Sequence, residues 1–191
     1  MSAADALGVL RLAAAAALPG ALAGALRGER WWFPLVLFTI GAASDFLDGV
    51  VARRGRGPTR HGAVLDNVAD IAFVLAGTGA GAALGLVPRA VPLAIAVAFA
   101  AYALASVDRT ARERTWRIAR SNLGHGAGVL NYALTGLVAG AAAIPGRFWN
   151  PILQLGSVLI VVVNLTAVLE RVGPWAARQA RGLRGAGRGA R

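Results

Sequence analysis

Six long apolar runs constrain this chain more than any other feature of its sequence. A helix needs roughly 20 apolar residues to cross the hydrocarbon core of a membrane, with about 17 to 25 tolerated. Hydrophobic residues make up 57% of the chain and charged residues only 15%, which is unusual for a soluble domain. We therefore expect an all-α, polytopic membrane protein with six transmembrane helices. They are expected at about 8–27, 31–54, 63–87, 91–107, 125–144 and 149–169.

The segments between these runs are too short to hold a soluble domain. The sequence therefore predicts one six-helix transmembrane domain over residues 1–172. The remaining residues, 173–191, are basic and rich in Gly and Arg, which is typical of a disordered tail. The chain has no cysteine, which excludes disulfides and thiolate metal sites.

Arginines are distributed unevenly among the loops, and this predicts the orientation in the membrane. The net charge is +11, and the segments after the second, fourth and sixth runs hold fifteen arginines, against four on the opposite side. Basic residues concentrate in loops that stay in the cytoplasm, so we expect both termini to be cytoplasmic. In so apolar a chain, we interpret this charge as a topology signal and expect no nucleic-acid partner.

The first run also allows another interpretation, namely a secretory signal peptide. Arg11, a run of alanines and the sequence ALAGA resemble the parts of such a peptide. Asp5 weakens the basic head that a signal peptide needs. Cleavage would leave the other five runs and their orientation unchanged.

Four of the nine acidic residues lie within 26 positions, at the ends of two apolar runs. Asp45 and Asp48 are three apart, and Asp66 and Asp70 are four apart, so each pair shares one face of its helix. The short loop between the two helices makes them antiparallel neighbours and brings the carboxylates together. Such a cluster needs cations, and hard divalent ions such as Mg²⁺ or Mn²⁺ suit carboxylate oxygen best, with two ions expected. The structural alternative is ion pairing with nearby arginines such as Arg53, although the loop arginines face water.

The segment from Asp45 to Asp70, DFLDGVVARRGRGPTRHGAVLDNVAD, resembles the signature of the CDP-alcohol phosphatidyltransferases. That signature reads Asp, two residues, Asp-Gly, two residues, Ala-Arg, eight residues, Gly, three residues, Asp, three residues, Asp. Every fixed position matches, at Asp45, Asp48, Gly49, Ala52, Arg53, Gly62, Asp66 and Asp70. The six-span layout is also similar to the fold of this family, so the resemblance covers most of the chain.

The resemblance implies a role for each matched residue. It makes Asp45, Asp48, Asp66 and Asp70 the ligands of two metal ions, and Asp70 also the general base that deprotonates the acceptor. Gly49 and Ala52 are similar to the small positions against which the cytidine nucleotide lies, and Arg53 and Thr59 to donors to the CDP moiety. Arg11 is similar to a family arginine, but the polar residues that usually flank it are absent, and we assign it no role.

The function implied by the resemblance is phospholipid synthesis. The chain would move a phosphatidyl group from CDP-diacylglycerol to an alcohol acceptor and release CMP. The family also implies a homodimer in the cell membrane, with the active site facing the cytoplasm. Five arginines beside Glu113, in the 109–120 loop, suit a phosphorylated polyol such as glycerol 3-phosphate. The same loop also fits a topology signal that touches anionic lipid.

Two other classes remain open at this point. A metal-dependent membrane prenyltransferase also binds pyrophosphate through aspartates, but its two acid motifs are usually well separated. A non-enzymatic transporter or metal-binding membrane protein would need more polar residues on its other spans. Those spans offer few beyond Asn131, Tyr132 and Asn164.

Overall fold

The computed structural model describes the backbone of residues 3–54, 60–113 and 122–186. Within these ranges the side chains of residues 3–4, 48–61, 63, 108–122 and 174–186 are outside the description. Every regular element in the described part of the chain is an α-helix, which confirms the all-α prediction. The helices are α1 (Ala3–Leu26), α2 (Phe33–Arg54), α3 (Arg60–Ala83), α4 (Ala90–Glu113), α5 (Asn122–Ala143) and α6 (Trp149–Ala186).

Five of these helices are long and apolar enough to cross a membrane. Their candidate spans are Asp5–Leu26, Val64–Ala83, Ala90–Val107, Leu123–Ala143 and Trp149–Gly173. The described apolar part of α2, Phe33–Leu47, is shorter than these five spans. The multi-pass membrane character is therefore supported by five helices, and the sixth span remains a prediction.

The outer faces of α4 and α6 are apolar and exposed. Leu104, Leu155 and Leu169 are each more than two-thirds exposed, with exposed fractions of 72%, 74% and 71%. Their exposure would be costly in water over so large an area, whereas lipid tails solvate such side chains. These two helices also pack against each other.

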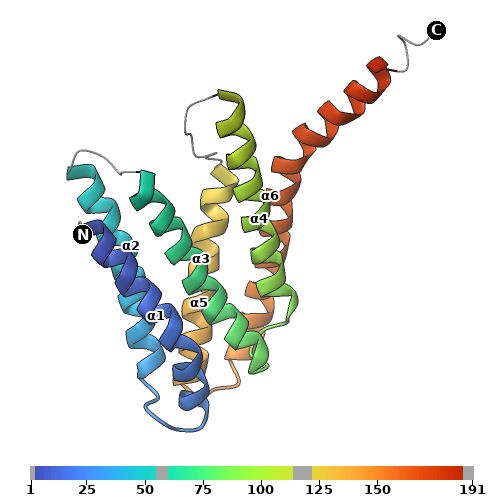
Figure 1. The fold of residues 1–191 in the computed structure, drawn as a ribbon. Coiled ribbons are helices and arrows are strands. Elements are labelled where there is room, and N and C mark those ends of the chain that lie inside the picture. The colour runs from blue at the N-terminus through green and yellow to red at the C-terminus, as the bar shows by residue number, and fades with distance from the viewer. Residues whose placement is uncertain (1–2, 55–59, 114–121, 187–191) are drawn as a thin grey trace.

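The helices form a bundle in which α1 lies between α2 and α3 (Figure 1). α1 packs extensively against both, whereas α2 and α3 touch each other only slightly. The sequence predicted α2 and α3 as direct neighbours because their loop is short. The small side chains of α1, mostly Ala and Gly, allow it to fit between them instead. α1 thereby becomes the inner helix of this part of the bundle.

Two aromatic rings occupy space that glycines leave open at the centre of the bundle. Phe73 of α3 lies over Gly41 of α2, where an added Cβ would stand 2.5 Å from the Phe73 ring. Phe38 of α2 lies over Gly136 of α5, where an added Cβ would stand 2.6 Å from the Phe38 ring. Both positions are restricted to glycine by the close approach of a side chain, which places α2, α3 and α5 against one another.

The final helix continues past the predicted end of the transmembrane domain. α6 contains 38 residues, which corresponds to about 57 Å, well beyond a hydrocarbon core of about 30 Å. Its last turns extend away from the bundle at the end where α1 begins (Figure 1). The division into a domain at 1–172 and a basic tail at 173–191 remains a prediction, with helical backbone as far as Ala186.

Candidate active site

Three aspartates, Asp45, Asp66 and Asp70, come together from α2 and α3 and are called the aspartate triad below. Asp45 lies just past the middle of α2, and Asp66 and Asp70 lie in the first half of α3. One carboxylate oxygen from each residue lies within 4.8 Å of those of the other two. The predicted convergence is therefore confirmed for three of the four aspartates, and the Asp48 side chain lies outside the described residues.

Arg11 of α1 lies beneath the aspartate triad and contacts all three members. Its Nη1 donates a hydrogen bond to Asp66 Oδ1 at 2.8 Å and another to Asp70 Oδ1. Its Nη2 lies 3.7 Å from Asp45 Oδ1. The guanidinium is fully buried, and burial of a charge requires partners of this kind. α1 therefore supplies the positive charge that holds the acids of α2 and α3 together.

Ser44 of α2 also helps to orient the Arg11 guanidinium. Arg11 Nε donates to Ser44 Oγ at 3.2 Å, and the Ser44 hydroxyl donates to the Gly41 carbonyl at 2.8 Å. Ser44 is itself buried. Because the guanidinium is a rigid planar fork, a bond at Nε and bonds at Nη1 fix its plane as well as its position. Arg11 is thus held by side chains of two different helices.

Tyr132 of α5 contacts the aspartate triad from another direction. Its hydroxyl donates to Asp70 Oδ1 at 2.9 Å. Its ring stacks on Phe73, with the ring centroids 5.6 Å apart and the planes 20° from parallel. Asp70 Oδ1 consequently accepts hydrogen bonds from both Arg11 and Tyr132.

The aspartate triad is accessible despite the burial of its partner. The exposed fractions of the side chains are 48% for Asp45, 39% for Asp66 and 33% for Asp70. When ionised, the three carboxylates outnumber the single guanidinium by two negative charges. Clustered, accessible carboxylate oxygens with excess negative charge are the donor set that hard divalent cations prefer. The residues present therefore fit a divalent metal site.

Sequence reasoning missed the parts that Arg11 and Tyr132 play. Arg11 did carry a signal, since an arginine inside an apolar run is costly and functional by default. The cost alone does not identify its partners. Tyr132 carried no comparable signal, because one tyrosine in a transmembrane helix is commonly an interfacial or packing residue.

Several residues implied by the signature cannot be placed beside the triad. Gly49, Ala52 and Arg53 belong to α2, but their side chains lie outside the described residues. Thr59 falls in the 55–59 gap. Residues 109–113 of the predicted 109–120 loop belong to α4, and the side chains of the whole segment are outside the description.

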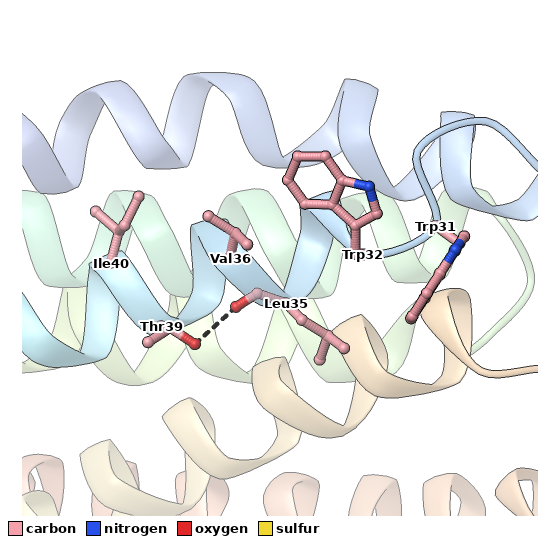
Figure 2. A pocket seen from close by; sticks show the side chains of 6 residues that line it. All are labelled: Trp31, Trp32, Leu35, Val36, Thr39 and Ile40. Atoms are coloured by element: carbon pink, nitrogen blue, oxygen red, sulfur yellow. Dashed lines mark hydrogen bonds between the residues drawn. The ribbon is translucent and has the colours of Figure 1, made fainter.

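An apolar groove of about 420 Å³ lies along the other half of α2 (Figure 2). Its six lining residues carry no ionisable group: Trp31, Trp32, Leu35, Val36, Thr39 and Ile40. The Thr39 hydroxyl donates to the Leu35 carbonyl at 2.8 Å, so it is bonded within its own helix. This groove offers no group that could perform acid, base or metal chemistry, unlike the aspartate triad.

Comparisons with known proteins agree with this geometry. Residues 1–173 match the family model described as CDP-alcohol phosphatidyltransferase. A 72-residue stretch is 44% identical to the CDP-diacylglycerol--glycerol-3-phosphate 3-phosphatidyltransferase of Cereibacter sphaeroides. That stretch covers 36% of this chain and 31% of the relative, so the match spans about a third of each protein. No solved structure matches the chain.

Proposed function

The chain belongs to the CDP-alcohol phosphatidyltransferase family, and on this basis we propose that it synthesises a phospholipid. In the proposed reaction a phosphatidyl group passes from a CDP-diacylglycerol-type lipid to an alcohol, and CMP is released. The observation that carries the proposal is the convergence of Asp45, Asp66 and Asp70 on oxygen atoms within 4.8 Å of one another. These are residues of the family signature, brought together from two helices.

The family depends on divalent metal, and the aspartate triad fits one. We assign the ligands as Asp45, Asp48, Asp66 and Asp70, holding two ions of Mg²⁺ or Mn²⁺. When bound, such ions offset the charge of a pyrophosphate and of a departing phosphate. The accessible sides of the three described carboxylates support this assignment.

Asp70 is assigned as the general base. The acceptor hydroxyl loses its proton to the Asp70 carboxylate while its oxygen forms a bond to the phosphorus of the phosphatidyl group. The bond from that phosphorus to the bridging oxygen of CMP breaks, and CMP leaves with the electron pair. Asp70 is the least exposed member of the triad and is hydrogen-bonded on one oxygen, which supports a defined orientation toward a bound alcohol.

Binding of the CDP moiety is assigned to residues of the same signature. Gly49 and Ala52 provide the close approach for the cytidine, because larger side chains would occupy its space. Arg53 and Thr59 donate to the CDP phosphates or ribose. All four follow Asp45 closely in the chain, and this proximity to the triad in sequence supports a shared nucleotide site.

The proposed acceptor is a phosphorylated polyol such as glycerol 3-phosphate. The Cereibacter sphaeroides relative is named for that substrate, and residues 109–120 of this chain include five arginines. Arginine pairs with phosphate through two parallel hydrogen bonds, which suits recognition of a phosphorylated alcohol. A neutral alcohol would not need this concentration of charge.

We also propose six spans in the cell membrane, with the active site and both termini on the cytoplasmic side. The carboxyl-terminal ends of α2, α4 and α6 lie at the same end of the bundle as the start of α3, the helix that carries Asp66 and Asp70 (Figure 1). The arginine-rich segments follow these ends, and such segments remain in the cytoplasm. A homodimer is proposed from the family resemblance alone.

Purified protein in lipid nanodiscs tests the proposed function. The assay supplies CDP-diacylglycerol and Mg²⁺ and scores CMP release with glycerol 3-phosphate, inositol phosphate, serine or glycerol. We expect the fastest release with glycerol 3-phosphate, and a new phospholipid in equal amount. Fast CMP release with serine or glycerol alone would overturn the proposed identity of the acceptor. Turnover of a prenyl diphosphate with no CMP release from any acceptor would overturn the reaction.

A further inference from the structure

We propose that Tyr132 is a positioning residue that orients the Asp70 carboxylate for metal binding and proton transfer. The inference rests on the proposed function and deepens it, because the family signature ends at Asp70 and does not include α5. Tyr132 lies 62 residues after Asp70 and donates to its Oδ1 at 2.9 Å.

The hydrogen bonds to Asp70 distinguish its two oxygens. A carboxylate oxygen has two lone-pair directions, and Asp70 Oδ1 accepts from both Arg11 Nη1 and Tyr132 Oη. The second oxygen, Oδ2, is therefore the one available to a metal ion or to a substrate proton. Without the Tyr132 bond, Arg11 alone would hold Oδ1, and rotation about χ2 could tilt the carboxylate plane and move Oδ2 from this position. Tyr132 thus helps to fix the plane of the Asp70 carboxylate.

Packing on Phe73 helps to fix the position of the Tyr132 hydroxyl. The Tyr132 ring stacks on Phe73, which is fully buried. Phe73 in turn lies against Gly41, where no side chain separates the ring from the α2 backbone. The hydroxyl position is therefore set by contacts that involve α2, α3 and α5. Partners of this kind, one step removed from a metal, typically change metal affinity or activity about 10- to 100-fold when removed.

A purely structural role for Tyr132 leads to a different expectation. A buried tyrosine hydroxyl needs some acceptor, and Asp70 could serve only to satisfy it. In that case loss of the hydroxyl would change stability and leave metal affinity unchanged. Metal affinity therefore separates the two roles.

The test is Mn²⁺ binding followed by electron paramagnetic resonance in the absence of lipid substrate. Tyr132→Phe keeps the ring that stacks on Phe73 and removes only the donor. The matched control is Tyr102→Phe, since Tyr102 is the other tyrosine of the chain and its ring contacts Arg171 on α6 instead. We expect Tyr132→Phe to weaken Mn²⁺ binding about tenfold and the control to leave it unchanged. Affinity within twofold of the wild type in Tyr132→Phe would overturn the proposal.

A second measurement leaves the hydroxyl in place. In the Tyr102→Phe background, 3-fluorotyrosine labels Tyr132 alone, because the chain has two tyrosines. We expect Mg²⁺ to shift the ¹⁹F resonance and Mn²⁺ to broaden it. A resonance that neither ion alters would overturn the proposal even if Tyr132→Phe did not fold. Neither measurement needs transferase activity. A chain whose Mn²⁺ affinity depends on Tyr132 but which releases no CMP would therefore contradict the proposed function and not this inference.

Discussion

Arg11 Nη1 and Asp66 Oδ1 are 2.8 Å apart, although 55 residues separate them in the chain. The guanidinium is fully buried on α1, a helix otherwise composed mostly of apolar and small residues. A buried charge in this setting is stable only when its partners are brought to it by other helices. The pair therefore links the first helix to the acids of α3 and makes α1 part of the candidate active site.

Replacement of Arg11 should lower stability as well as activity. Arg11→Ala leaves the aspartate triad without its counter-charge, and we expect a loss of about 1–3 kcal/mol in the free energy of unfolding. The lower part of this range allows for the partial exposure of the carboxylates. Arg11→Lys restores the charge but not the planar fork, so it should recover part of the stability. Thermal unfolding in detergent measures the stability of both variants. An Arg11→Ala protein as stable as the wild type would contradict the assigned contacts.

Removal of Asp45 or Asp66 should abolish metal binding. Asp45→Asn and Asp66→Asn each remove one negative charge and one strong oxygen donor, so Mn²⁺ affinity and CMP release should fall together. Excess chelator should stop CMP release by the wild type. The control is Glu29→Gln. In the wild type the Glu29 carboxylate lies in the loop before α2 and accepts a hydrogen bond from Arg27 Nε at 2.9 Å. Normal Mn²⁺ affinity in both aspartate variants would exclude them as ligands.

Asp70→Asn should separate proton transfer from folding. The Asn amide oxygen can still accept from Arg11 and Tyr132, so the variant should fold and bind CDP-diacylglycerol. It cannot accept the substrate proton, and turnover should fall about 10²-fold or more. A titration with Mg²⁺ shows which function is lost, because added metal rescues a weakened ligand but not a missing base. Recovery of turnover at saturating Mg²⁺ would leave Asp70 as a ligand only.

Gly41→Ala should damage the site without touching an acidic residue. The added Cβ would lie 2.5 Å from the Phe73 ring, so the ring has to move, and with it the stacked Tyr132. We expect Mn²⁺ affinity to fall in the same direction as in Tyr132→Phe. Gly79→Ala on α3 is the matched control, because a Cβ there meets open space. In Gly41→Ala/Phe73→Leu, the smaller leucine side chain replaces the ring and should relieve the clash. A fully normal Gly41→Ala protein would argue against this packing.

Asn131 and Asn164 should contribute to stability and not to catalysis. Asn164 Nδ2 donates to Asn131 Oδ1 at 2.8 Å, and the return bond from Asn131 Nδ2 is 3.4 Å long. Both are buried between α5 and α6, where such pairs contribute about 1 kcal/mol. Asn164→Leu should lower the unfolding temperature, and Asn131→Leu/Asn164→Leu should lose less than the sum of the two single changes. Additive losses would show that the two amides act independently.

The sequence by itself determined the helices, the membrane character and the acidic signature. Apolar runs of about 20 residues form helices because every backbone group must be bonded within its own segment in lipid. The spacing of Asp66 and Asp70 places both carboxylates on one helix face for the same local reason. These features depend on residues close together in the chain, so they are readable before folding. The convergence of Asp45 with the pair on α3 was also predicted, but on the premise that α2 and α3 are direct neighbours, which was wrong because α1 lies between them.

Only the tertiary structure decided which residues complete the site. Arg11 and Tyr132 reach Asp70 from α1 and α5, and nothing in their local sequence specifies that acceptor. The position of α1 between α2 and α3 depends on how small side chains and rings fit, such as Phe73 against Gly41. In lipid the helices gain little from hydrophobic contact with one another, so close packing and buried polar bonds decide their arrangement. Those interactions exist only between residues distant in the chain, and they form when the bundle does.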